Sequence, residues 1–295
     1  MEQAAQLCDI RYIRDILARH GFHFSRSLGQ NFLTDSRIPK TIVERAGLSK
    51  IHGVLEIGPG LGALTAVLSE AAGQLVAVEA DKSLPPLLNE TLHGRDNVTV
   101  VQADILKTDL RALVKERFEG LVPVVCANLP YNITTPVLTH LLEADLFESI
   151  TVMVQKEVAG RLCASAGTKE YGAFTVYVGV RAVCETLFDV PPQCFTPAPR
   201  VTSSVIRLTR RILPLCDSVL FQRVVRAAFG QRRKTLPNAL SGAVALSKQE
   251  LADALVSCGF SPMVRGETLD IAAFDRLTCE LKARLSRAGT HVGPP

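Results

Sequence analysis

Short apolar runs alternate with amphipathic segments along the first two thirds of the chain. The apolar runs predict buried strands at 52–58, 74–80, 97–104, 122–131 and 150–156. Helix patterns lie between several of them, at 63–72, 82–92 and 135–142. Continuous β-branched runs separated by helices are typical of a parallel sheet that is covered on both faces. The pattern therefore predicts an α/β fold whose ligands bind at the carboxyl ends of the strands.

The pattern changes after Gly172. The segments 173–183 and 203–209 predict antiparallel strands added to the sheet around a Pro-rich loop. The rest of the chain is predicted to be helical, at 218–229, 235–243, 248–256 and 271–285.

A length of 295 residues suits two domains at roughly 150 residues each. The first is expected at 1–213 and includes an N-terminal helical segment. The second, at 214–295, is expected to be small and all-helical, with a flexible tail from about residue 286.

Composition excludes several classes of protein. With 47% hydrophobic and 21% charged residues, the chain is not disordered, collagen-like or a coiled coil. No apolar run approaches the ~18 residues of a membrane span. The N-terminus carries charges where a signal peptide needs an apolar core, so we expect a cytoplasmic protein. The eight cysteines form no CxxC pair and have no histidine at zinc spacing, so neither a metal site nor a disulfide framework is predicted.

Positive charge is concentrated in one stretch of the sequence. The net charge is only +4, but nine Arg and Lys residues lie between Arg200 and Lys234 against a single acid, Asp217. Such a concentration suits a polyanionic partner such as a nucleic acid. The alternative is an ordinary solvated face.

A glycine-rich turn follows the first predicted strand. The sequence EIGPGLGALT (56–65) places Gly58, Gly60 and Gly62 between a strand and a helix, where a ligand can approach the backbone closely. The spacing is not the GxGxxG of dinucleotide sites, and Pro59 lacks an N–H that a pyrophosphate would use. The turn favours a ligand without phosphate, unless it is a plain tight turn.

Acidic residues end the next two strands. Glu79 is placed to accept hydrogen bonds from both hydroxyls of a ribose, and Asp104 from the exocyclic amine of an adenine. Beside a glycine-rich turn, the two acids suit an adenosine without phosphates, and S-adenosylmethionine fits. Either acid alone has an ordinary alternative, as a helix N-cap or a solvated strand end.

The fourth strand ends in Asn128-Leu129-Pro130-Tyr131. An exocyclic base amine is a poor nucleophile, because its lone pair is delocalised into the ring. The Asn128 side-chain oxygen and the Pro130 carbonyl are candidate acceptors that would hold such an amine near a methyl donor, while Tyr131 stacks on the base. Catalysis would then be mainly positioning. The alternative is a turn with a buried tyrosine.

These motifs together resemble one family, the small-subunit ribosomal RNA adenine N6,N6-dimethyltransferases known as KsgA. They belong to the Rossmann-like class I methyltransferases, which use S-adenosylmethionine. The resemblance covers nearly the whole chain, and the matching segments include SLGQNFLTD (27–35), EIGPGLGALT, ANLPYNI (127–133), FTPAPRVTSSV (195–205) and RAAFGQRRKTLPNAL (226–240).

The resemblance implies a role for each matched position. Gln30, Asn31 and Leu33 close over the donor, and Gly58 contacts its methionine end. Gly60, in the same turn, also binds the donor. Glu79 binds the ribose and Asp104 the adenine. Asn128 faces the donor's methyl group and the target amine, beside Pro130. Phe195 packs on the target base opposite Tyr131, so that the two rings sandwich an adenine that has left its stack.

The resemblance also implies a partner. The family methylates two adjacent adenosines twice each, in the 3'-terminal hairpin of small-subunit rRNA. The expected substrate is the pre-30S particle, bound by a monomer, and no DNA is expected. The cations that would grip RNA phosphates are Arg200, Arg223, Arg226, Arg232, Arg233 and Lys234.

Three alternatives stay open at this point. The first is a large-subunit rRNA adenine methyltransferase of the antibiotic-resistance type, which would share the fold and the site. The second is a DNA adenine or protein glutamine methyltransferase, although Leu129 replaces the first proline of their Asn-Pro-Pro-Tyr turn. The third is an RNA-binding assembly or transcription factor in which catalysis matters less than binding.

Overall fold

The computed structural model describes residues 5–22, 30–287 and 289. The chain divides into two compact units: residues 1–159 with 184–210, and residues 160–183 with 211–295. The chain passes for the last time from the first unit to the second between Arg210 and Arg211, close to the predicted boundary near 213. Residues 160–183, expected in the first domain, belong instead to the helical unit.

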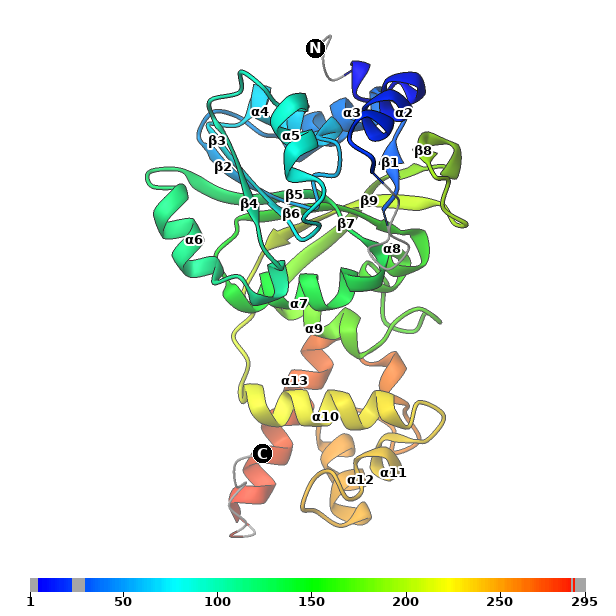
Figure 1. Cartoon of the computed structure of the whole chain (residues 1–295). Coiled ribbons are helices and arrows are strands. Elements are labelled where there is room, and N and C mark those ends of the chain that lie inside the picture. Colours follow the sequence, from blue (N-terminus) through cyan, green and yellow to red (C-terminus); the bar gives the residue numbers. More distant parts are fainter. Residues whose placement is uncertain (1–4, 23–29, 288, 290–295) are drawn as a thin grey trace. The chain divides into compact units, whose positions relative to one another are not determined.

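The first unit contains a sheet of seven strands in the order β4-β3-β2-β5-β6-β9-β7 (Figure 1). Strands β2 to β6 pair in parallel, and β9 pairs antiparallel with β6. The strands are β2 (His52–Ile57), β3 (Gln74–Glu79), β4 (Val98–Gln102), β5 (Val122–Asn128), β6 (Ser149–Gln155), β7 (Ala182–Val190) and β9 (Ser203–Arg210). All five parallel strands were predicted from their apolar runs.

Helices cover both faces of this sheet, as predicted, with α4 and α5 on one face and α6 and α7 on the other (Figure 1). The helices are α2 (Ile10–Arg19), α3 (Arg37–Ala46), α4 (Ala63–Ala71), α5 (Pro85–Thr91), α6 (Leu110–Arg117) and α7 (Thr134–Ala144). Helix α5 begins at Pro85 rather than at 82, because proline suits the first helical turn, where its missing N–H is not needed. A separate two-stranded sheet joins β1 (Phe32–Leu33) to β8 (Phe195–Thr196).

The strand predicted at 173–183 is wrong. Residues Ala173–Arg181 form helix α9, and the strand β7 begins only at Ala182. Its β-branched residues favour a strand by propensity, but Val176 and Val180 lie one helical turn apart and both are buried in the core of the second unit. The Thr175 hydroxyl also accepts the Gly172 N–H at 3.0 Å, which fixes the start of the helix. Burial on one face of a helix outweighs propensity here.

The second unit is helical, as predicted. Its remaining elements are α10 (Ser218–Gly230), α11 (Leu236–Leu240), α12 (Lys248–Ser257) and α13 (Ile271–Arg287), with the 3-10 turn η5 at Gly266–Thr268. Phe221 of α10 packs edge-on against Phe274 of α13, with ring centroids 6.4 Å apart. Over the described residues, no helix is long and apolar enough to cross a membrane.

Candidate functional site

A cavity of about 290 Å³ lies where the parallel strands of the first unit end. Its walls come from the turns after β2, β3, β4 and β5, and from the N-terminal segment around β1. The sequence-predicted residues that line it are Gln30, Asn31, Leu33, Gly58, Gly60, Glu79, Asp104, Asn128, Pro130 and Tyr131. The fold therefore gathers at one edge of the sheet groups that are up to about a hundred residues apart in the sequence.

The glycine-rich turn after β2 needs its glycines. Gly58 and Gly60 have φ of 67° and 60°, in the left-handed region that side chains disfavour. A Cβ at Gly60 would also lie 3.2 Å from the ring of Phe32, so the N-terminal segment rests directly on the turn. Helix α4 starts immediately afterwards, and the positive end of its dipole favours a carboxylate there.

The charge of the cavity is one-sided. Three carboxyl groups line it, from Glu56, Glu79 and Asp104, and the described lining residues include no lysine, arginine or histidine. A cavity with carboxyl groups and no cation disfavours phosphates, and it favours cationic ligands, which in turn favour the ionised form of these carboxyls. An adenosine that carries a sulfonium and an ammonium group fits this charge, whereas a nucleotide does not.

Glu79 ends β3 with its side chain only 7% exposed. Burial raises the pKa of its carboxyl above the usual value, and the Asp81 N–H, donated to Oε1 at 2.8 Å, opposes the rise. Backbone N–H groups of Gly60 and Ala80 also lower the pKa, so the carboxylate is held at the edge of the glycine-rich turn. A ribose diol is a chemically suitable donor for a carboxylate placed there.

Glu56 was missed by the sequence analysis. It lies inside the apolar run of β2, is 1% exposed and lines the cavity. Burial raises the pKa of its carboxyl to about 8, the Thr65 hydroxyl beside it opposes the rise, and Glu79 adds to it. Its Oε2 has no hydrogen-bond partner in the described part of the chain. A carboxylate in an otherwise apolar parallel strand was the signal that could have identified it.

Asp104 follows β4, where the sequence predicted it, but part of its side chain is already in use. One oxygen, Oδ1, accepts the Leu106 N–H at 3.0 Å and caps the 3-10 turn η2 (Ile105–Lys107). The other, Oδ2, lies 3.7 Å from the Lys107 ammonium. Asp104 therefore does cap this turn, and a ligand at Asp104 would bind Oδ2, which it would share with the Lys107 ammonium.

Asn128 is the last residue of β5, at the point where the strand enters the cavity. Its side-chain amide makes no hydrogen bond with the described residues, so its oxygen is free to accept one from a ligand. The Leu129 N–H donates to the Met153 carbonyl at 3.2 Å, which fixes the turn. The Pro130 carbonyl already accepts from the Ile133 N–H and the Thr134 hydroxyl, each at 3.2 Å. A target amine would therefore have to displace one of these two long bonds to reach Pro130.

Tyr131 begins the 3-10 turn η3 (Tyr131–Ile133) and forms one wall of the cavity. Burial raises the pKa of its phenol, against the opposing hydrogen bond with Ser203, so the ring is neutral near neutral pH. Its predicted partner in a base sandwich, Phe195, does not line the cavity. The Phe195 ring is 4% exposed and lies in the core of the first unit, where β8 pairs it with Leu33.

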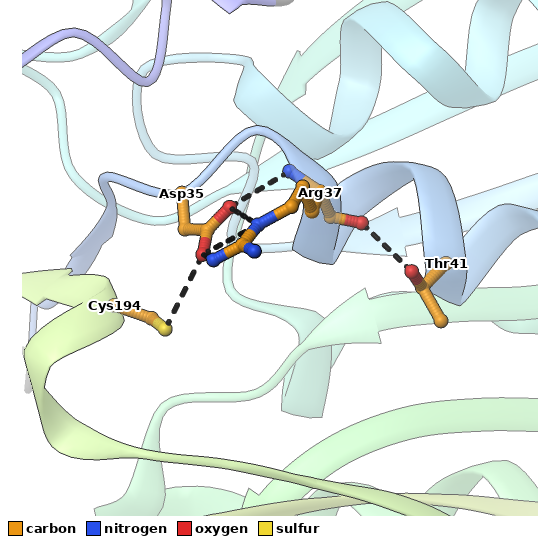
Figure 2. Close-up of polar contacts among 4 residues, drawn as sticks. All are labelled: Asp35, Arg37, Thr41 and Cys194. Carbon is orange, nitrogen blue, oxygen red and sulfur yellow. Dashed lines mark hydrogen bonds and ion pairs between the residues drawn. The ribbon is translucent and has the colours of Figure 1, made fainter.

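The N-terminal segment is held over the cavity by polar contacts at both ends of β1. At one end, the Gln30 amide donates to Asp81 Oδ2 at 2.6 Å. At the other, Figure 2 shows Asp35 between the Arg37 guanidinium, which donates to Oδ2 at 2.6 Å, and the Cys194 thiol at 3.8 Å. The residues of SLGQNFLTD before Gln30 lie outside the described residues.

The predicted RNA-binding cations fall in both units. Arg200 is exposed in the loop before β9 of the first unit, and the other five lie in the second unit, on α10 and just after it. Arg226, Arg233 and Lys234 are exposed, and Arg223 is half-buried. Among the described residues these four have no ion-pair partner. Arg232 differs, because its Nε donates to Glu267 at 2.6 Å and its Nη2 to the Thr168 carbonyl at 3.2 Å.

Comparison with known proteins decides what kind of chain this is. A family model for ribosomal RNA adenine dimethylases matches residues 21–256, which include every part of the cavity except Leu7. The chain belongs to the ribosomal RNA adenine dimethylase family. Members of this family are methyltransferase enzymes, so the binding-protein alternative is disfavoured.

Relatives in this family match over nearly their whole length. The ribosomal RNA small subunit methyltransferase A of Geobacillus thermodenitrificans is 46% identical over 273 residues, which cover 90% of this chain and 93% of that protein. The protein of the same name from Streptococcus thermophilus strain CNRZ 1066 is 44% identical over 285 residues, 94% and 98% of the two chains.

Solved structures show the same fold. A dimethyladenosine transferase from Plasmodium falciparum has a TM-score of 0.71 at 24% identity, over 88% of this chain and 99% of that one. The 23S rRNA methyltransferase ErmE has a TM-score of 0.65 at 28% identity, over 85% and 99%. These likenesses confirm the predicted Rossmann-like methyltransferase fold of this dimethylase.

Proposed function

We propose that this dimethylase uses S-adenosylmethionine to convert two adjacent adenosines of the 3'-terminal hairpin of small-subunit rRNA to N6,N6-dimethyladenosine. We propose further that it acts in the cytoplasm, as a monomer, on a precursor of the small subunit. The observation that carries the proposal is the cavity at the strand ends, in which three carboxyl groups and the free amide of Asn128 face one space.

The donor fits the residues present. S-adenosylmethionine supplies an electrophilic methyl group on a sulfonium. Glu79 would hold the ribose hydroxyls, and Oδ2 of Asp104 the adenine amine. The unpartnered Oε2 of Glu56 suits the donor's ammonium group, and the positive end of α4 suits its carboxylate. Gln30, Asn31 and Leu33, in the segment around β1, would exclude water from the bound donor.

The target adenine would lie beside Asn128 and Tyr131. The Asn128 oxygen would accept a hydrogen bond from one N–H of the amine. This bond would orient the nitrogen lone pair toward the methyl group. The nitrogen would bond to the methyl carbon as the bond from sulfur to that carbon breaks, and S-adenosylhomocysteine would leave. No residue needs to remove a proton first, because the methylated ammonium product is acidic and loses a proton to water. The rate then comes from holding the two reactants in line. Dimethylation requires the first product to re-enter, so the space around the amine must also accept an N-methyl group.

The small subunit is favoured over the large subunit as the source of the rRNA. The two curated relatives at 44% and 46% identity carry the small-subunit name, whereas the 23S rRNA methyltransferase ErmE is 28% identical. Because both branches share the fold, the cavity alone does not separate them.

Methyl transfer to purified subunits tests the proposal. Labelled S-adenosylmethionine is incubated with the protein and either unmethylated small subunits or large subunits. We expect label in the small-subunit rRNA alone. Label in the large-subunit rRNA would support the ErmE-like alternative, and no label with RNA binding intact would support a binding protein.

Donor binding should release a proton from Glu56. Its pKa of about 8 means that the carboxyl is mostly protonated near neutral pH, and an incoming ammonium group favours the charged form. Titration of S-adenosylhomocysteine in buffers of different ionisation enthalpy measures this release, since that product keeps the ammonium group. We expect affinity to rise with pH up to about 8, and Glu56→Gln to abolish the release. A release that persists in Glu56→Gln contradicts the assignment.

Arg233 and Arg232 should behave differently although they are neighbours. Arg233 is exposed and unpaired among the described residues, so Arg233→Ala should lower the slope of log affinity against log salt by about 1 for the rRNA hairpin. Arg232 is bound to Glu267, so Arg232→Ala should leave the slope unchanged and lower stability by less than about 1 kcal/mol. Equal slopes for the two variants would refute this division of roles.

A further inference from the structure

The hydroxyl group of Tyr131 is tied to a strand that contributes nothing to the described cavity lining. It shares a hydrogen bond of 2.6 Å with Oγ of Ser203, the first residue of β9. Ser203 is completely buried and is absent from that lining. The two residues are 72 positions apart, so the bond is a tertiary contact rather than part of the turn at Tyr131.

The bond reaches across one strand of the sheet. Tyr131 lies shortly after β5, and β6 separates β5 from β9 in the strand order. Ser203 is fixed there by its backbone, because it pairs in register with Gln155, the last residue of β6. The neighbouring Thr202 carbonyl also accepts the Lys156 N–H at 3.0 Å. The phenol of Tyr131 is therefore anchored to a rigid part of the sheet.

Ser204, the next residue, makes a different contact. Its hydroxyl donates to Asp189 at 2.6 Å, and the other oxygen of Asp189 accepts from the Lys156 ammonium at 2.6 Å. Successive side chains of a strand point to opposite faces, so the two serines serve opposite sides of β9. Both are buried, at 0% and 1% exposure. The chain thus offers two adjacent buried serines, of which only one reaches the cavity wall.

We propose that Ser203 is a positioning residue that sets the position and the axis of the Tyr131 ring for stacking on the target adenine. A tyrosine side chain turns about two bonds, and its phenol oxygen lies on the axis of the second. The hydrogen bond with Ser203 therefore fixes the direction of that axis, and with it the place of the ring. Stacking depends on the angle and offset between the two rings. A small misplacement of the base moves its amine off the line of the donor's methyl group, which costs rate rather than donor affinity. This role rests on the proposed function, because it matters only if Tyr131 contacts the target.

The test compares four variants on unmethylated small subunits: Ser203→Ala, Tyr131→Phe, the double variant and Ser204→Ala. For each, kcat of methyl transfer and the Kd of S-adenosylhomocysteine are measured. We expect Ser203→Ala to lower kcat by about 10- to 100-fold with an unchanged Kd. Tyr131→Phe should lower it equally, and the double variant should fall no further, because all three lack the same hydrogen bond. Ser204→Ala should keep the wild-type kcat.

The other possible results contradict either the positioning role of Ser203 or the proposed function. A wild-type kcat in Ser203→Ala, or effects of the two single variants that multiply in the double variant, overturns the positioning role. Loss of kcat in Ser204→Ala as well would show a general effect of disturbing β9 and would also overturn it. If Ser203→Ala does not fold, Tyr131→Phe removes the same bond without altering β9, and a wild-type kcat there overturns the role. An inactive wild-type protein would instead refute the proposed function.

Discussion

Asn128→Ala is expected to remove nearly all methyl transfer while leaving donor binding nearly unchanged. The Asn128 amide is unpartnered among the described residues and lies at the strand end that enters the cavity. Its proposed role is to accept a hydrogen bond from the target amine. Removal of one pre-organised polar group from an active site typically costs about 10²- to 10³-fold in rate. The measurements are kcat on unmethylated small subunits and the Kd of S-adenosylhomocysteine.

The matched control for this variant is Asn89→Ala. Asn89 is an exposed asparagine of α5 that does not line the cavity, so its replacement should change neither quantity. Turnover of Asn128→Ala within a few-fold of wild type would reject the role of Asn128 as acceptor for the amine. A large loss of donor affinity in the same variant would instead place Asn128 in donor binding alone.

Glu79→Ala is expected to weaken donor binding by about 10- to 100-fold. A hydrogen bond to a charged acceptor contributes about 1.5–3 kcal/mol, and about 1.4 kcal/mol corresponds to tenfold in affinity. Glu79→Gln keeps the shape of the side chain but loses the charge, so it should retain part of the affinity. Calorimetric titration with S-adenosylhomocysteine measures both variants.

Glu119→Ala is the control for the loss of one acid, because Glu119 is exposed and does not line the cavity. We expect its Kd to equal that of the wild type. An unchanged Kd in Glu79→Ala would remove Glu79 from the ribose site. Thermal unfolding without ligand separates this result from a folding defect, since Glu79 also accepts the Asp81 N–H.

The parallel sheet could be predicted from the sequence because its strands are buried on both faces. Burial on both faces produces continuous apolar runs, and the five runs at 52–58 to 150–156 all became strands. Helix α9 could not be predicted in the same way. Its valines carry a strong strand signal, and only the packing of Val176 and Val180 among the C-terminal helices shows that they form a helical face.

The candidate site was predictable where a residue ends a strand. Glu79, Asp104 and Asn128 each lie at or just beyond such an end, and parallel topology brings these ends together. Glu56 was missed because it lies inside its strand. The bond between Tyr131 and Ser203 could not be predicted, since it depends on β9 entering the sheet beside β6 in one particular register.

The position of Phe195 shows a different limit. The resemblance placed it on the target base, whereas the structure buries it beside Leu33 in the two-stranded sheet. To reach a base, the ring would have to leave the apolar core of the first unit, in which it is buried. A motif match identifies the residue, but it does not predict the conformation that its side chain has in the structure.

Mapping the methylated nucleosides in the rRNA tests the central claim most directly. Unmethylated small subunits are incubated with the protein and S-adenosylmethionine, and the 3'-terminal hairpin of the rRNA is isolated and analysed by mass spectrometry. The predicted result is a gain of four methyl groups, present as N6,N6-dimethyladenosine at two adjacent positions. Methylation at a single adenosine, at another base, or outside that hairpin would contradict the claim.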